Sequence, residues 1–236
     1  KQLIWTTTVL VFIILGFLIL QTETSFFTFG DFPNYWAAGR LQATHQNPYD
    51  PNQIIRLKAE VGQSLDELKL LTCIIYPPWT LPILQPFGLI PFKLSRMLWL
   101  ITHIGILIYA TQKIWEIYDG PSRFKWLSSL ILIAFFPTTF LLAVGHIDSL
   151  FLLGVILFIS LVSNKKPNSF SKFDFIAGFS LVFTFIKIHV LYLFLLTVLI
   201  WVLRYKRWNV LLGIITSIST FTIIAIAINP NVFQQY

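Results

Sequence analysis

Long apolar stretches separated by short polar segments constrain this chain more than any other feature of its sequence. Crossing the hydrocarbon core of a bilayer takes about 20 residues of α-helix. A soluble fold could not hide so many apolar helices in succession. The sequence therefore predicts an all-α membrane protein with about seven transmembrane helices. We place the spans at residues 3–21, 94–112, 126–144, 147–163, 173–187, 190–203 and 208–228.

Three parts of this pattern predict irregular helices. The fifth and sixth spans are short, so they form either two helices or one broken helix pair. Pro137 should kink the third span, because proline removes a backbone hydrogen bond. Residues 74–91 are also apolar, but their five prolines exclude one straight helix. We interpret that segment as re-entrant or interfacial.

The charged residues support a membrane protein and argue against a nucleic-acid partner. Only 11% of residues are charged, whereas soluble domains have about 25%. The net charge of +7 comes from short basic clusters between apolar runs, not from one continuous basic face. Cys73 is the only cysteine, so the sequence predicts neither a disulfide framework nor a zinc site. No cofactor is expected.

The basic clusters also predict an orientation, since lysine and arginine in short loops stay on the cytoplasmic side. Residues 113–125, 165–172 and 204–207 are basic and would lie inside. The turn at residues 145–149 and the long loop at residues 22–93 would then lie outside. We expect a multi-pass protein of the cell membrane with its active site on the outer face.

The long loop carries signals of helix formation. Asp50 before Pro51 has the pattern of an N-cap followed by proline at the first helical position. Residues 64–67 match a capping box. Because the loop is also rich in aromatic residues, we predict that it forms amphipathic helices on the outer membrane surface.

Ionisable residues near the outer ends of the spans are the main functional signal, because they are costly there unless they pair, reach water or do chemistry. Asp31 follows the first span, in an aromatic run from Phe29 to Trp36. A carboxylate among aromatic side chains gains proton affinity and suits a general base. The alternative interpretation is an N-cap for a helix beginning near Pro33.

Two more groups stand at outer ends. His146 and Asp148 occupy the turn between the third and fourth spans, while Lys187 and His189 end the fifth. Lys187 could bind a phosphate or could only snorkel to the headgroups. Asp148 could be an N-cap, and His146 a surface residue. Two such residues do not make a metal site, and we predict none.

All three groups fall on one face under the predicted topology, which favours an active site. A pore would distribute ionisable residues through the interiors of the spans. The span centres of this chain are nearly free of them. His103 is the exception, and we interpret it as a hydrogen-bonded core residue. The alternatives from other classes are a lipid or solute transporter or flippase and a non-catalytic scaffold. A transporter predicts inverted repeats and buried midplane charges, which the sequence does not display.

Several motifs resemble glycosyltransferase family 87, the polyprenyl-phosphate-mannose-dependent mannosyltransferase-like proteins. The run from Asp31 to Leu41 and the following Asn47-Pro48-Tyr49-Asp50 are similar to the family's first-loop motif. Tyr76-Pro77-Pro78, Gly145-His146-Ile147-Asp148 and the stretch from Ala177 to Lys187 follow in the family's order. The family usually has Gly-Gln where this chain has Gly-His.

The resemblance implies a GT-C-type polytopic helix bundle, with a large outer first loop and a variable module after the first seven helices. The chain begins with Lys1, its only methionine is Met97, and it ends at Tyr236. We therefore expect it to be a fragment, one GT-C-like module over residues 1–236 without the variable module.

The chemistry implied by the resemblance is inverting transfer of mannose or another hexose or pentose. The donor would be a polyprenyl-phosphate sugar and the acceptor a lipid or glycan, without a nucleotide sugar or an essential metal. Asp31 takes the position of the base, and Arg40 and Lys187 are candidates to stabilise the departing phosphate. The candidate substrate-binding residues are Tyr35, Trp36, Arg40, Tyr76, His146, Asp148, Lys187 and His189.

Overall fold

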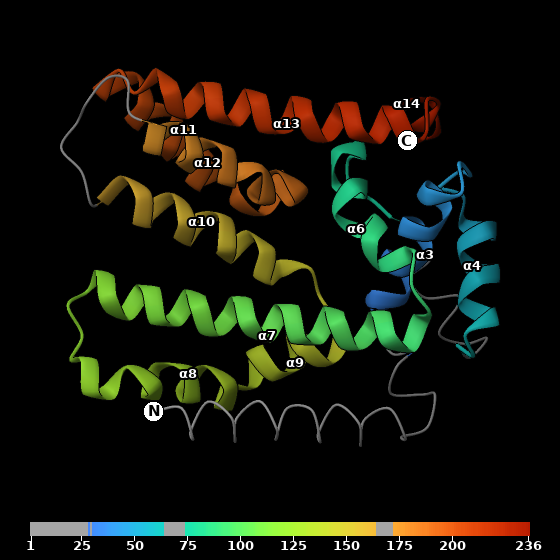
Figure 1. Ribbon diagram of the computed structural model, residues 1–236, viewed down its shortest axis with the longest axis horizontal. Coiled ribbons are helices and arrows are strands. Elements are labelled where there is room, and N and C mark those ends of the chain that lie inside the picture. Colours follow the sequence, from blue (N-terminus) through green and yellow to red (C-terminus); the bar gives the residue numbers. More distant parts are fainter. Residues whose placement is uncertain (1–27, 29, 64–73, 164–171) are drawn as a thin grey trace.

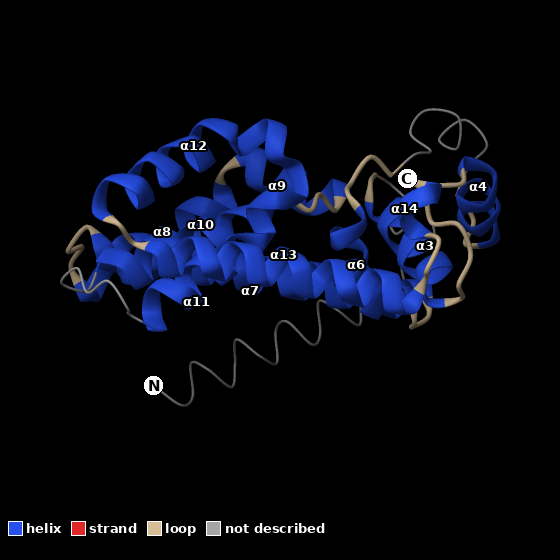
Figure 2. Ribbon diagram, turned by 90° about the horizontal axis from the view of Figure 1, so that it is seen from above, coloured by secondary structure: helices blue, strands red, loops and turns tan. Residues whose placement is uncertain are grey.

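The structure is a computed structural model that describes residue 28 and residues 30–63, 74–163 and 172–236 (Figure 1). These residues form helices and no strand, which confirms the predicted all-α class (Figure 2). The predicted span at residues 3–21 and the capping box at residues 64–67 lie outside the described residues.

Four helices form the body of the molecule and pack in the order α7, α10, α11, α13 (Figure 1). Their bounds are Phe92–Ile117, Asp148–Ser163, Lys172–Ser180 and Trp208–Ile228. At one end they meet α3 (Phe32–Ala43), α4 (Pro51–Glu60) and α6 (Leu81–Gly88), and we call this the loop end. The far end contains the turn after α7 and the beginning of α13.

By length and composition, three helices of the described part could cross a membrane: Phe92–Ile117, Lys172–Tyr205 and Trp208–Ile228. A bent pair, Ser122–Leu132 with Phe136–Val144, would make a fourth. The α10 helix is apolar but has only 16 residues. The chain thus has the helices of a membrane protein, but the predicted count of seven spans is not confirmed.

The predicted fifth and sixth spans form one helical run without an intervening loop. It consists of α11, the 3₁₀ helix η3 (Leu181–Lys187) and α12 (Ile188–Tyr205). Lys187 has φ −128° and ψ 76°, which are not helical values. This is the broken helix pair that the sequence left as one of two possibilities, and the break exposes the next residues, Ile188 and His189.

The predicted kink at Pro137 is confirmed. The third span is divided into α8 (Lys125–Ala134) and α9 (Phe136–Val144), and the bend is 60°. Phe135 between them is extended, with ψ 116°. Pro137 then falls in the first turn of α9, where backbone N–H groups have no hydrogen-bond partner within the helix. The missing N–H of proline therefore costs no hydrogen bond at this position.

At the loop end, α3 differs from the predicted surface helix because it is enclosed by protein on nearly all sides. It packs against α6 at two glycines. A Cβ atom on Gly39 would lie 2.5 Å from the Leu84 carbonyl oxygen, and one on Gly88 would lie 2.1 Å from the Arg40 nitrogen. Only residues without a side chain allow the two backbones to approach so closely.

The second loop helix, α4, agrees better with the prediction. The Asp50 carboxylate accepts a hydrogen bond of 2.9 Å from the Asn52 N–H, and Pro51 is the first helical residue. Ile54 and Lys58 are its buried residues, while most others are at least partly exposed. The proline-rich segment is also not straight: it forms η1 (Pro78–Thr80) and the short α6. The last helix, α14 (Val232–Gln235), follows α13.

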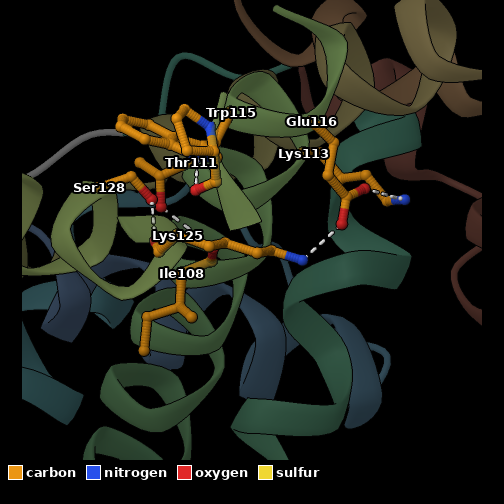
Figure 3. Close-up of polar contacts among 8 residues, drawn as sticks. Ile108, Thr111, Lys113, Trp115, Glu116, Lys125 and Ser128 are labelled. Carbon is orange, nitrogen blue, oxygen red and sulfur yellow. Dashed lines mark hydrogen bonds and ion pairs between the residues drawn. The ribbon is translucent and has the colours of Figure 1, made fainter. Parts of the chain in front are cut away.

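The far end is held by exposed polar contacts that join α7 to residues on either side of the η2 turn (Ser122–Phe124), which leads into α8 (Figure 3). Glu116 accepts hydrogen bonds from Lys113, at 2.8 Å, and from Lys125. The Trp115 indole donates to the Pro121 carbonyl at 3.1 Å. The basic cluster at residues 113–125 thus lies at the end opposite the loop helices.

Candidate active site

Six polar side chains at the loop end contact one another in a closed circuit, which we call the polar ring. Its members, in order of contact, are Asp31, Tyr35, Tyr76, Lys187, Asp148 and His146. They come from five places: the residue before α3, α3 itself, the segment before η1, the turn from α9 into α10, and the end of η3. All six were candidates from the sequence.

Distances define the ring. The Tyr35 hydroxyl donates to Asp31 Oδ2 at 3.2 Å and lies 3.0 Å from the Tyr76 hydroxyl. The Lys187 ammonium lies 5.5 Å from the centre of the Tyr76 ring and donates to Asp148 Oδ1 at 3.1 Å. His146 Nδ1 closes the circuit, 3.9 Å from Asp148 Oδ1 and 3.3 Å from Asp31 Oδ2.

Asp31 is positioned by its backbone. Its N–H donates to the Val144 carbonyl at the end of α9 at 2.9 Å. Gly30 has φ +87°, and a Cβ there would lie 2.2 Å from the same carbonyl oxygen. Asp31 precedes α3 in the N-cap position, but its side chain caps nothing in the described residues. The carboxylate turns instead to Tyr35 and His146, so the capping alternative is not the arrangement in the structure.

The turn that carries His146 depends on Gly145, which ends α9 with φ +75°. A Cβ on Gly145 would lie 1.8 Å from Arg96 Nη1. The Trp99 indole donates to the Gly145 carbonyl at 3.0 Å, and the Arg96 guanidinium donates to the Ala143 carbonyl. Two side chains of α7 thus hold the turn in place by hydrogen bonds to its carbonyl groups.

The two tyrosines are buried, at 2% and 6% exposure, and their contacts decide their protonation. Burial, with the nearby Tyr76 and Asp31, raises the pKa of Tyr35 well above its usual value. Burial also raises the pKa of Tyr76. Both phenols therefore stay protonated at neutral pH, and Tyr35 remains a hydrogen-bond donor to Asp31. The Tyr49 hydroxyl supports Tyr76 by donating to its carbonyl at 2.9 Å.

The charged members of the ring differ in exposure. The side chains of Lys187 and Asp31 are 14% and 19% exposed, while those of His146 and Asp148 are 31% and 41% exposed. Solvent or a ligand therefore reaches the ring on the side of His146 and Asp148. Counting two carboxylates and one ammonium, the ring carries one negative charge when His146 is neutral.

Three other candidates lie outside the ring. Trp36 is buried, donates to the Ile90 carbonyl at 3.1 Å and packs edge-on against Phe92. Arg40 lies 5.4 Å from the Trp36 ring centre and lines a separate groove of about 600 Å³ beside α4. His189 is exposed, past the break at Lys187.

Sequence reasoning did not single out Arg96 and Trp99, which support the Gly145 turn. The available signal was Arg96, a charge inside a predicted span that must find a partner. It donates to the Ala143 carbonyl and lies 5.2 Å from the centre of the Phe32 ring. His103 agrees with its interpretation as a core residue: it is buried, and its Nδ1 lies 3.0 Å from the Trp99 carbonyl oxygen.

No group of three or more histidine, cysteine, aspartate or glutamate side chains in the described residues is arranged to hold a metal ion. The chemistry that these six side chains can supply is proton transfer at the Asp31 carboxylate, with a positive charge on Lys187 in the same circuit. A carboxylate can take a proton from a hydroxyl, and an ammonium can stabilise a developing phosphate charge.

Comparison with known proteins gives the family of the chain. The family model of glycosyltransferase family 87 matches residues 74–236, more than half of the chain. The chain belongs to glycosyltransferase family 87. No curated protein and no solved structure matches it. The resemblance predicted from the motifs is confirmed.

Family membership makes the protein a membrane glycosyltransferase that uses a donor and an acceptor substrate. The matched residues include four members of the polar ring, Tyr76, His146, Asp148 and Lys187. Asp31 and Tyr35 precede the matched range, and the contacts described above join them to the other four.

Proposed function

We propose that this glycosyltransferase family 87 protein transfers a sugar from a polyprenyl-phosphate donor to a lipid or glycan acceptor, with inversion at the anomeric carbon. The sugar is mannose or another hexose or pentose, and the reaction occurs on the outer face of the cell membrane. The observation that supports this most is the polar ring, which joins a carboxylate and an ammonium from distant parts of the chain.

Asp31 serves as the general base. It accepts the proton of the acceptor hydroxyl as the hydroxyl oxygen attacks the anomeric carbon. The Tyr35 hydroxyl and the backbone bond to Val144 hold the carboxylate in place before substrate arrives. A base held in position contributes more to the rate than a mobile one, because no ordering is needed during the reaction.

Lys187 binds the donor phosphate. Its ammonium is paired with Asp148 at 3.1 Å, and Asp148 is the most exposed member of the ring. A phosphate entering from the exposed side can therefore share the ammonium with Asp148. As the bond between the anomeric carbon and the phosphate oxygen breaks, negative charge grows on the phosphate, and a fixed cation stabilises it.

The sugar itself would enter on the exposed side of the ring, beside His146 and Asp148, because Tyr35 and Tyr76 are buried behind them. The raised pKa values keep both tyrosine hydroxyls protonated, so Tyr35 continues to donate to the Asp31 carboxylate. The predicted roles of Trp36, Arg40 and His189 are not part of this proposal, because these side chains lie outside the ring.

The decisive experiment compares wild-type full-length protein with Asp31→Asn in nanodiscs, using a polyprenyl-phosphate sugar as donor. Asparagine keeps the shape of the side chain but cannot accept the proton. Loss of a general base should lower transfer about 10²- to 10⁴-fold. A thermal melt on the same samples should show no change, because the Asp31 side chain caps no helix in the described part of the chain.

Normal turnover by Asp31→Asn would exclude Asp31 as the base. Transfer from a nucleotide sugar but not from any polyprenyl-phosphate sugar would contradict the proposed donor class.

A further inference from the structure

His146 is the member of the polar ring whose side chain can be either neutral or positively charged, because an imidazole ring can carry one proton or two. Its Nδ1 lies 3.3 Å from Asp31 Oδ2, yet the two atoms are not aligned as a hydrogen bond. The contact is therefore one whose strength depends mainly on the charge of the imidazole.

The surroundings of His146 contain charged groups from every element packed against it. Asp31 precedes α3 and Asp148 begins α10, and both carboxylates approach Nδ1. Lys187 of η3 acts on it through Asp148. From α7, Arg96 lies beneath Gly145, and His103 lines the same small cavity as His146.

These groups act on a protonated imidazole in opposite directions. The two carboxylates lie closest and attract a positive charge, while the Lys187 and Arg96 cations oppose it. Protonation would bring the charge of the ring from minus one to zero and would place a cation 3.3 Å from the proposed base. A cation at that distance stabilises the ionised carboxylate and makes it a weaker proton acceptor.

We propose that His146 is a positioning residue that acts through Asp31: neutral imidazole leaves the Asp31 carboxylate free to accept the acceptor proton, and imidazolium withholds it. This inference rests on the proposed function and adds a regulation of the same site. Sugar transfer is then switched off by mild acid at the exposed side of the ring. The donor adds no switch of its own, since a phosphodiester has no proton to lose near neutrality.

The activity test measures kcat between pH 7.5 and 5.5 for wild type and His146→Gln in nanodiscs. Glutamine keeps a polar side chain of similar length that does not titrate. We expect wild-type kcat to fall about tenfold over this range and that of the variant to change less than about twofold. His45→Asn is the matched control, because His45 is exposed, lies outside the ring and has φ +58°, which asparagine tolerates.

The inference would be overturned if the kcat of His146→Gln fell between pH 7.5 and 5.5 as steeply as that of wild type. Should His146→Gln fail to fold, Asp148→Asn decides instead. It removes one of the two carboxylates that favour the imidazolium, so the fall in kcat should move to lower pH. If the kcat of Asp148→Asn fell at the same pH as that of wild type, the result would count against the inference.

A second measurement separates this inference from the proposed function. The chain has four histidines, so the His146 ring can be followed by NMR in labelled protein and identified from the His146→Gln spectrum. Its titration midpoint should fall in Asp31→Asn. If wild type transfers no sugar at any pH, the proposed function fails. A midpoint that is the same in wild type and Asp31→Asn would refute the coupling, whatever the activity.

Discussion

Two cation–carboxylate pairs in this protein have the same length and different surroundings. Arg207 at the beginning of α13 donates to Asp174 of α11 at 3.1 Å, and Lys187 donates to Asp148 at 3.1 Å. The Arg207 and Asp174 side chains are only 7% and 4% exposed, whereas Asp148 is 41% exposed. Arg207 also lies 4.8 Å from the ring centre of Trp201. The Arg207–Asp174 pair is therefore buried, whereas the Lys187–Asp148 pair is accessible to solvent at Asp148.

The difference separates stability from function. Desolvation offsets much of the attraction within a buried ion pair. Neither residue can leave its partner for a ligand without leaving an unpaired charge in the protein interior. The open pair shares its carboxylate with His146 and its ammonium with the Tyr76 ring. We therefore expect substitutions at the far-end pair to change folding, and substitutions at the loop-end pair to change substrate binding.

The largest effect is expected for Arg207→Met, which leaves the buried Asp174 carboxylate without its cation. Removing one partner of a buried pair costs about 3–5 kcal/mol. The measurement is unfolding of the purified protein in detergent. Arg204→Met is the control, because Arg204 is exposed and such surface changes stay within about 0.5 kcal/mol. Equal stability of the two variants would show that burial does not distinguish these sites.

The next effect is expected for Lys187→Met, which keeps length and removes the charge. Hydrogen bonds to charged groups contribute about 1.5–3 kcal/mol, so donor binding should weaken about ten- to hundredfold. Lys113→Met is the matched control, since Lys113 pairs with Glu116 at the exposed far end. Unchanged donor binding in Lys187→Met would leave this lysine with the snorkelling role that the sequence also allowed.

The smallest effect is expected on the free energy of unfolding when either of two glycines, Gly145 or Gly105, is replaced by alanine. Gly145→Ala places a side chain at φ +75° and into Arg96, and it should cost about 1–3 kcal/mol. Gly105 of α7 has open space at the Cβ position, so Gly105→Ala should stabilise the helix by about 0.5–1 kcal/mol. Both are measured in the same unfolding assay. A stable Gly145→Ala protein would show that the turn beneath His146 adapts freely.

Four residues of the ring were candidates because ionisable groups at span ends have few alternatives. Tyr35 and Tyr76 were candidates because they stand in motifs that resemble the family's. Asp31, the turn with His146 and Asp148, and Lys187 were expected on one face from the alternation of basic and non-basic loops. In the structure these residues contact one another. The family and the all-α class followed from motif order and from the apolar runs.

Spacing alone could have separated Arg40 from the ring. It stands nine positions after Asp31, which is two and a half turns at 3.6 residues per turn, so the two side chains point to opposite sides of α3. The other differences depended on details that the sequence does not carry. Trp36 turned inward because α3 is enclosed by α6 and α7, which no local pattern reveals. The number of spans was uncertain because α10 is short and because α11, η3 and α12 run together.

The contacts of the polar ring also set the order in which the ring can assemble during synthesis of the protein. Tyr35 and Tyr76 are 41 residues apart, and Asp148 and Lys187 are 39 residues apart. A chain made from its amino end presents Asp31 and Tyr35 long before η3 exists. Nascent chains that end before Lys187 thus contain the whole first loop and an incomplete circuit. Site assembly has to wait for insertion of the helices that bring Asp148 and Lys187 to Asp31.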